Sequence, residues 1–249
     1  MSLLTAAVHN NAVWCDTVCR ALDCDTAWVD GLWVNRDPAP PYYSNAVTTD
    51  PDRTAAQLEG VRRMLESPLP RPWTIKDGFS TLDLSPMRFG ILFSAQWIAA
   101  PAAHRFVGAP AAGLSWTAAA DDLELGAWER AWQDANDTPV PGDRLFRPSL
   151  LADPDMRFVA GWEDDRIVAV AAANRSDDGS GPVVGVSNIV LRGAGAERHR
   201  GGLMAAVQDV YPGLPLVGYE RGDDLTAMTA LGFRPTGALR VWIAPARAP

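Results

Sequence analysis

The sequence predicts a mixed α/β (α+β) fold of two tandem domains, each a mixed, partly antiparallel sheet flanked by helices. Three observations predict this class. Apolar patterns of helical and strand period alternate along the 249 residues. Each half ends in the order strand, helix, strand, helix, strand, and the second half opens with a strand, a helix and a hairpin. Three short segments of the first half also recur in the second half.

The recurring segments keep their order and nearly one spacing: SNAV at 44–47 returns as SNIV at 187–190, VNR at 34–36 as ANR at 173–175, and WIA at 97–99 as WIA at 242–244. Three matches in one order at one spacing favour an internal duplication. A stretch rich in Ala, Pro and Gly at 101–113 separates the two halves. We therefore expect the domain boundary there.

In the first half, Asp50-Pro51 precedes a helical pattern, and proline at that place favours a helix start. Strand patterns are bounded by Gly, Pro, Asn and Asp, which are turn residues. The expected elements are a helix at 3–23, strands at 27–35 and 42–49, a helix at 52–66, a strand at 73–76, a short helix at 83–89 and a strand at 92–98.

In the second half, two strand patterns flank Asp164-Asp165, which favours a hairpin. An apolar strand follows, and then strands and helices alternate. The expected elements are a strand at 114–119, a helix at 123–134, hairpin strands at 157–162 and 166–174, a strand at 183–191, a helix at 202–211, a strand at 216–219, a helix at 225–231 and a strand at 238–243.

The charge balance is acidic, with 22 basic and 30 acidic residues and a net charge of −8. Basic residues form no dense run, so we expect no nucleic-acid partner. No apolar run approaches the roughly 18–20 residues of a membrane span, and the first residues lack the basic start of a signal peptide. We expect a cytoplasmic protein, a monomer or a homodimer, without a membrane partner. Lys76 is the only lysine, and abundant Ala and Arg are typical of a high-GC bacterial genome.

Cys15, Cys19 and Cys24 lie close together, and His9 would complete a set of four metal ligands. That spacing matches no zinc site in common use. Cys15 and Cys19 are four residues apart and share one face of the first expected helix. We expect buried free thiols and no bound metal.

An Arg- and Gly-rich turn, Arg198-His199-Arg200-Gly201-Gly202, follows the apolar strand 183–191 and opens a helix. The helix that it opens is followed by a strand and then by a helix ending in Leu-Gly-Phe at 231–233. On these features, residues 112–249 resemble the GCN5-related N-acetyltransferase (GNAT) superfamily. Residues 1–105 resemble a degenerate copy of the same domain.

The resemblance implies acetyl-CoA, or another acyl-CoA, as co-substrate. In the family a strand, then R-x-x-G-x-G/A, then a helix holds the CoA pyrophosphate, and the best register here is Arg198-x-x-Gly201-x-Leu203. Leu203 replaces the last small residue of that motif. A helix start offers free N–H groups and a positive dipole end to a phosphate. Glycines let the backbone approach it, and Arg198 or Arg200 adds charge.

We further expect the strand edge at Ile189, Val190 and Leu191 to pair with the amides of the pantetheine arm. His199 and Gly202 belong to the same expected phosphate turn. Two other interpretations stay open: a dinucleotide fold based on the glycines at 193 and 195, and a glycine-rich loop without a ligand.

The resemblance implies transfer of an acyl group to a small-molecule amine. Many family members use a tyrosine as the acid, but Met228 occupies that position and cannot donate a proton. Tyr219 and Glu220, at the end of the strand before the last helix, are the candidates to replace it. Alternation places their side chains on opposite faces, and Glu220 is our candidate base. Asp223 and Asp224 are expected as the N-cap and first-turn acids of that helix.

In the first half, the turn at 49–53 replaces the phosphate turn. Pro51 lacks an N–H, and Asp50 and Asp52 would repel a pyrophosphate. We therefore expect no second CoA site there. We expect Tyr42, Tyr43 and the tryptophans of this half to pack the core and not to form a substrate cage. A protein that binds acyl-CoA without turnover, or acts as a scaffold, remains the alternative function.

Overall fold

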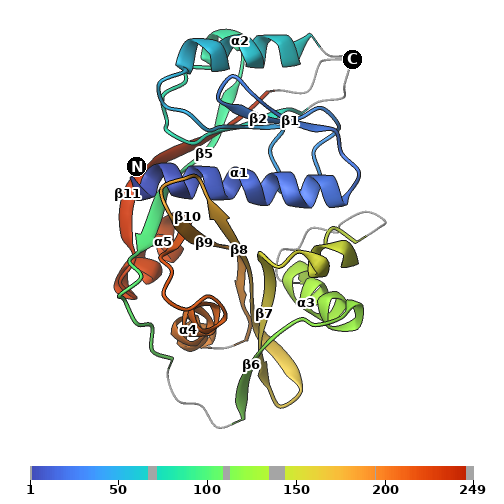
Figure 1. Cartoon of the computed structure of the whole chain (residues 1–249), viewed down its shortest axis with the longest axis vertical. Coiled ribbons are helices and arrows are strands. Elements are labelled where there is room, and N and C mark those ends of the chain that lie inside the picture. The colour runs from blue at the N-terminus through green and yellow to red at the C-terminus, as the bar shows by residue number, and fades with distance from the viewer. Residues whose placement is uncertain (1, 67–71, 109–112, 135–143, 194, 245–249) are drawn as a thin grey trace.

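The structure, a computed structural model, describes residues 2–66, 72–108, 113–134, 144–193 and 195–244. In these residues eleven strands form one continuous sheet flanked by five α-helices (Figure 1). The strands are β1 (Thr26–Val29), β2 (Leu32–Asn35), β3 (Ala46–Thr48), β4 (Thr74–Asp77), β5 (Gly90–Ala100), β6 (Leu114–Ala118), β7 (Met156–Glu163), β8 (Arg166–Asp177), β9 (Pro182–Leu191), β10 (Leu216–Glu220) and β11 (Arg234–Ile243).

The helices are α1 (Leu3–Ala21), α2 (Thr54–Leu65), α3 (Asp122–Asp134), α4 (Arg200–Val210) and α5 (Gly222–Ala230), with 3-10 turns η1 (Ser85–Met87), η2 (Pro148–Ala152) and η3 (Ala196–His199). None of the helices in the described part of the chain is long and apolar enough to cross a membrane. The expected alternation of helices and strands is confirmed, and so is the mixed, partly antiparallel sheet.

The two halves of the chain exchange their last strands. The strand order is β1-β2-β3-β4-β11-β5-β10-β9-β8-β7-β6. β11, from the end of the chain, therefore lies between β4 and β5, while β5 lies between β11 and β10. The pairing pattern of the halves is alike: β3 is antiparallel to β2 and parallel to β4, as β9 is antiparallel to β8 and parallel to β10. The exchange merges the two sets of strands into one sheet.

Helices cover both faces of this sheet. On one face, α1 packs with α3 through Trp14, Val18, Trp128 and Trp132. On the other face, α4 packs beneath β8 and β9, and α2 covers the strands of the first half. Figure 1 shows α1 crossing the middle of the molecule, where it contacts strands of both halves.

A pair of buried asparagines fixes α1 on the second half. The Asn10 side-chain amide donates to the Asn174 carbonyl oxygen on β8 at 2.9 Å, and the Asn174 amide donates to the Asn10 carbonyl oxygen at 3.3 Å. Both residues are at most 2% exposed. Gly185 on β9 makes room for this pair, because a Cβ there would lie 1.8 Å from Asn10 Oδ1. The pair therefore sets the position of α1 above β8 and β9.

Two expectations for the first half differ from the structure. The strand expected at 27–35 is a hairpin of β1 and β2, because Asp30 and Gly31 both have positive φ and turn the chain. The strand expected at 42–49 is only β3, because Tyr42 has a φ of 72°. The expected boundary at 101–113 includes residues 109–112, which lie outside the described residues. The division into two domains stays a prediction.

Gly185→Ala tests the docking of α1. The added methyl group collides with the Asn10 side chain and separates two buried hydrogen-bonding groups, so we expect the free energy of unfolding to fall by about 2–4 kcal/mol. Chemical denaturation measures this loss. Gly90→Ala on β5 is the matched control, since a Cβ there meets no atom within 4 Å. An equal loss in both variants would contradict the role given to the asparagine pair.

Candidate active site

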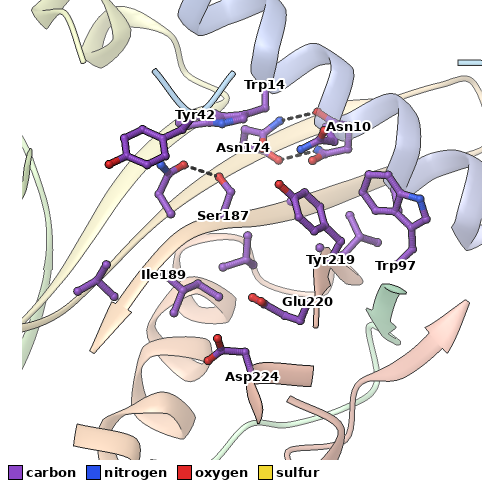
Figure 2. A pocket seen from close by; sticks show the side chains of 18 of the residues that line it. Asn10, Trp14, Tyr42, Trp97, Asn174, Ser187, Ile189, Tyr219, Glu220 and Asp224 are labelled. Carbon is purple, nitrogen blue, oxygen red and sulfur yellow. Dashed lines mark hydrogen bonds between the residues drawn. The ribbon is translucent and has the colours of Figure 1, made fainter. Parts of the chain in front are cut away.

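A cavity of about 480 Å³ opens where β9 and β10 separate. These parallel strands pair only at Val184 with Leu216 and at Gly185 with Val217. Beyond Val217 they diverge, and the cavity occupies the space between them (Figure 2). It is lined by α1, by the segment before β3, by β4 and by the start of α4, so both halves of the chain contribute.

A β-bulge in β9 lies beside this opening. Ser187 pairs with Ala172 on β8, whereas the next pair joins Val190 to Val170, so β9 holds an extra residue. Asn188 has a φ of 54° at the bulge, and the Ser187 hydroxyl donates to Asn188 Oδ1 at 3.0 Å. A bulge re-aims side chains and interrupts the regular ladder. The bulged stretch, including Ile189, Val190 and Leu191, lines the cavity.

Tyr219 and Glu220, the two sequence candidates on β10, both border the cavity. Tyr219 shares its face of the sheet with α1 and contacts the Trp97 ring edge-to-face, with 5.4 Å between ring centroids. Glu220 is on the opposite face, close to Asp224 of α5 (Figure 2). The expected alternation holds, and both side chains reach one cavity because the sheet is split at this point.

The environment of Glu220 favours its neutral form. The pKa of Glu220 is raised from 4.5 to about 7: burial raises it most, the nearby Asp224 carboxylate also raises it, and Arg200 acts in the opposite direction. Near neutral pH the group is therefore divided between acid and carboxylate. A carboxyl group with this pKa can take a proton from a reacting group and return it at physiological pH.

The positive charge of Arg200 is balanced by two carboxylates, those of Glu197 and Asp224. Its guanidinium donates to both Glu197 carboxylate oxygens at 2.8 and 2.9 Å and to Asp224 Oδ1 at 2.7 Å. The side chain is only 6% exposed. It ties the start of α4 to the first turn of α5. The N-cap of α5 is Arg221, so the expectation of an aspartate N-cap was wrong, although Asp223 and Asp224 do lie in the first turn.

The other residues of the expected phosphate turn contact protein atoms. A Cβ at Gly201 would lie 2.6 Å from the Val107 carbonyl oxygen, and one at Gly202 would lie 2.7 Å from the Trp116 ring. Both glycines therefore let α4 pack closely. Leu203 lies in the core.

His199 is 1% exposed, and neither ring nitrogen has a hydrogen-bond partner among the described residues. Burial and the charge of Arg198 lower the pKa of His199. Arg198 is 46% exposed and pairs with Glu163 at 3.2 Å. Phosphate binding by this turn stays a prediction.

The sequence analysis did not predict several residues of the first half that line the cavity. Lys76 on β4 and Asn11 on α1 lie at the end of the cavity nearest α1, and Tyr43 and Trp14 line it there too. Trp14, Tyr43 and Trp97 pack in the core, as expected, and they also border the cavity. Tyr42 is exposed and borders it as well. One sequence feature could have indicated these residues: Lys76 is the only lysine and lies beside apolar residues in a short strand.

Of the three cysteines, Cys15 borders the cavity. Cys15, Cys19 and Cys24 are free thiols, of which the first two are buried, and burial raises the pKa of each of those two. Over the described ranges, no three His, Cys, Asp or Glu side chains gather in a group that could hold a metal ion.

Comparisons with known proteins identify the fold. No family model matches the chain, and no curated protein matches it significantly. Among solved structures, a GCN5-related N-acetyltransferase from Kribbella flavida is 17% identical with a TM-score of 0.63, and the match covers 94% of this chain and 95% of that one. A GCN5-related N-acetyltransferase from Sphaerobacter thermophilus is 12% identical with a TM-score of 0.53, covering 78% and 68%.

A functionally unknown conserved protein from Staphylococcus epidermidis is similar over 90% of this chain and 95% of its own, at 11% identity and a TM-score of 0.62. The chain therefore has the fold of the GCN5-related N-acetyltransferases, and the resemblance inferred from the second half is confirmed at the level of the fold. The likeness extends over nearly the whole chain, first half included.

The raised pKa of Glu220 predicts a pH-dependent effect on stability. Ionisation is harder in the folded state than in the unfolded state, so wild-type stability decreases as pH rises from 4.5 through about 7. Glu220→Gln removes this ionisation and is expected to stabilise the protein at pH 8, by up to about 3 kcal/mol.

The gain should vanish as the pH falls below 4.5. Urea denaturation at several pH values measures it. Glu59→Gln on the exposed surface of α2 is the control and should show no such trend, since Glu59 is exposed and forms a surface ion pair with Arg62. A pH-independent effect of Glu220→Gln would contradict the raised pKa.

Proposed function

We propose that this protein is an acyltransferase that moves an acyl group, acetyl in the simplest case, from acyl-CoA to a small-molecule amine. One observation carries the proposal. A largely buried carboxyl group with a pKa near neutrality, Glu220, borders a cavity at the split between two parallel strands. A positioned base whose pKa lies near the working pH accelerates proton transfer from an amine.

In the proposed complex, the pantetheine arm lies along β9. Beyond Gly185 this strand has no β10 partner, so the backbone of 189–191 is free on that edge to pair with the amides of the arm. The pyrophosphate lies at the turn that precedes α4, where Arg198 supplies an accessible positive charge. Arg200 supports the turn through Glu197 and Asp224 and does not contact the phosphate.

The acyl transfer needs one base and one acid. Glu220 takes a proton from the ammonium group of the acceptor, and the free amine then attacks the thioester carbonyl carbon. A tetrahedral intermediate forms, and its collapse breaks the carbon–sulfur bond and expels the CoA thiolate. The thiolate takes a proton from the Tyr219 hydroxyl or from water, and the nitrogen of the new amide gives up its second proton, which restores that hydroxyl or water. Glu220 then releases the first proton to solvent. Met228 is 1% exposed in the core beside α4 and takes no part.

The alternative function is binding of acyl-CoA without turnover. Two observations favour it: Arg200 is neutralised by two carboxylates, and Met228 replaces the tyrosine that many similar enzymes use. Thiol release from acetyl-CoA in the presence of an amine panel separates the two functions. CoA binding with no thiol release would favour the alternative.

We also propose that residues 1–105 are a degenerate GNAT-like domain without a CoA site and that residues 112–249 hold the CoA site. In the first half, the Gln57 side chain fills the corresponding turn and donates to the Gly31 and Asp50 carbonyl oxygens. Arg53 pairs with Asp30 on the adjacent hairpin. This turn is therefore closed by its own side chains.

Arg198→Glu tests the position of the CoA site. The substitution replaces an accessible cation by a carboxylate, and we expect CoA affinity to fall about 10–100-fold. Isothermal titration with CoA measures it. Arg53→Glu, in the matching turn of the first half, is the control and should bind CoA as the wild type does. Equal losses in both variants would show that the first half also binds CoA.

Glu220→Gln tests the proton transfer. The amide cannot accept a proton, so we expect kcat/KM to fall by about 10²–10⁴-fold at pH 7 with CoA affinity unchanged. The loss should be smaller at high pH, where free amine already exists. Wild-type kcat/KM should rise with pH through about 7, as the carboxylate forms beside Asp224 and Arg200. Full activity of the variant across the pH range would exclude Glu220 from the mechanism.

A further inference from the structure

The end of the cavity nearest α1 holds a buried ammonium group. Lys76 is 6% exposed and lines the cavity from β4. Its Nζ donates to Asn11 Oδ1 at 2.7 Å and to the Tyr219 hydroxyl at 3.5 Å. Nζ also lies 4.6 Å from the centroid of the Tyr219 ring. All of these partners are neutral groups.

No carboxylate neutralises this cation. Among the described residues no Asp or Glu oxygen lies within 4 Å of Nζ, although Arg200 in the same cavity has two such partners. The carboxylates of Glu220, Asp224 and Glu197 gather around Arg200 on the opposite face of the sheet. Burial lowers the pKa of Lys76, whereas Tyr219 and Cys15 raise it, and the balance lies above its ordinary value. A buried charge without a counter-charge is unfavourable by several kcal/mol.

A second donor in this region also lacks an acceptor. The Tyr43 hydroxyl is buried in a residue that is 8% exposed, and no acceptor among the described residues takes its hydrogen bond. Tyr43 lines the same cavity as Lys76 and is coupled electrostatically to Tyr219, which Lys76 contacts. One ammonium without a carboxylate partner and one hydroxyl without an acceptor among the described residues therefore line the same cavity.

We propose that the acyl acceptor carries a carboxylate that binds Lys76 and Tyr43, so that the acceptor is an amino acid or a similarly small amino-carboxylate. One carboxylate oxygen accepts from Nζ and the other from the tyrosine hydroxyl, and this matches two donors better than a phosphate, which presents three oxygens. The amine of the same molecule points toward Glu220. The inference rests on the proposed acyltransferase function and names its substrate class.

The polarity of the cavity fits such a zwitterion. A cation stands at the end nearest α1, and carboxylates stand at the end nearest α4 and α5. Tyr219 borders the cavity between them, with its hydroxyl toward Lys76. Its neighbour along β10 is Glu220 (Figure 2). An amino-carboxylate placed along this axis meets an opposite charge at each end, whereas a simple amine leaves Lys76 without a counter-charge.

The kinetic test compares each L-amino acid with its primary amide as acceptor, using acetyl-CoA. For the wild type we expect kcat/KM to be at least about tenfold higher for the preferred acids than for their amides. Lys76→Met should bring this ratio close to one. Tyr43→Phe, which removes only a hydroxyl, should lower the ratio by a smaller factor. Arg62→Met, which removes an exposed cation on α2, is the control and should keep the wild-type ratio.

A binding test separates this inference from the acyltransferase function. Because Lys76 is the only lysine, selective labelling with lysine carrying 13C at Cε gives a single lysine signal in the NMR spectrum. We expect titration with amino acids, but not with their amides, to shift this signal in the wild-type protein, with or without CoA. The measurement needs neither turnover nor a folded Lys76→Met variant.

The outcomes distinguish the two proposals. A shift with amino acids and no acetylation of any amine would support the carboxylate site and overturn the acyltransferase function. Acetylation of acids and amides at equal rates, with no shift of the Lys76 signal, would overturn the carboxylate site and leave the acyltransferase function standing. A preference for amines that lack a carboxylate would also overturn the carboxylate site.

Discussion

The exchange of β5 and β11 is the constraint on which the candidate site depends. The whole length of β10 pairs with β5, from Leu216 opposite Ala100 to Glu220 opposite Gln96. This pairing holds β10 extended past Val217, where β9 leaves it. Without β5, the end of β10 would have no backbone partner on either edge, and unpaired backbone groups in a buried strand are strongly unfavourable. The strand that carries Tyr219 and Glu220 is thus supported by the other half of the chain.

The split in the sheet also explains how groups that would neutralise each other stay apart. Tyr219 and Glu220 are neighbours in sequence, yet they face opposite layers of helices. The ammonium of Lys76 belongs to the layer of α1, and the carboxylates belong to the layer of α4 and α5. Opposite charges within one cavity normally pair, but here strand alternation keeps them on separate faces. Sites of this kind give up stability for chemistry, as the environment of Glu220 illustrates.

The sequence was sufficient for the order of elements and for one side of the site. Apolar periodicity located β9, β10 and the helices beside them, and Glu220 lies where it was expected. Lys76, Asn11 and Tyr43 could not be found in this way, because an exchange of strands leaves no local pattern that joins residue 76 to residue 219. The glycines at 201 and 202 illustrate another limit: a sequence shows that a Cβ is missing but not which atom takes its place.

The exchanged strands have a consequence for how the chain is made. Synthesis proceeds from the N-terminus, so β4 and β5 leave the ribosome long before β11, the strand that must lie between them. Until then both strands expose an edge, and exposed edges promote pairing with other chains. The first half cannot complete its share of the sheet until β11 has been made. We infer that Arg234–Ile243 closes the sheet late in synthesis, and that the nascent protein depends on protection of its sheet edges until that moment.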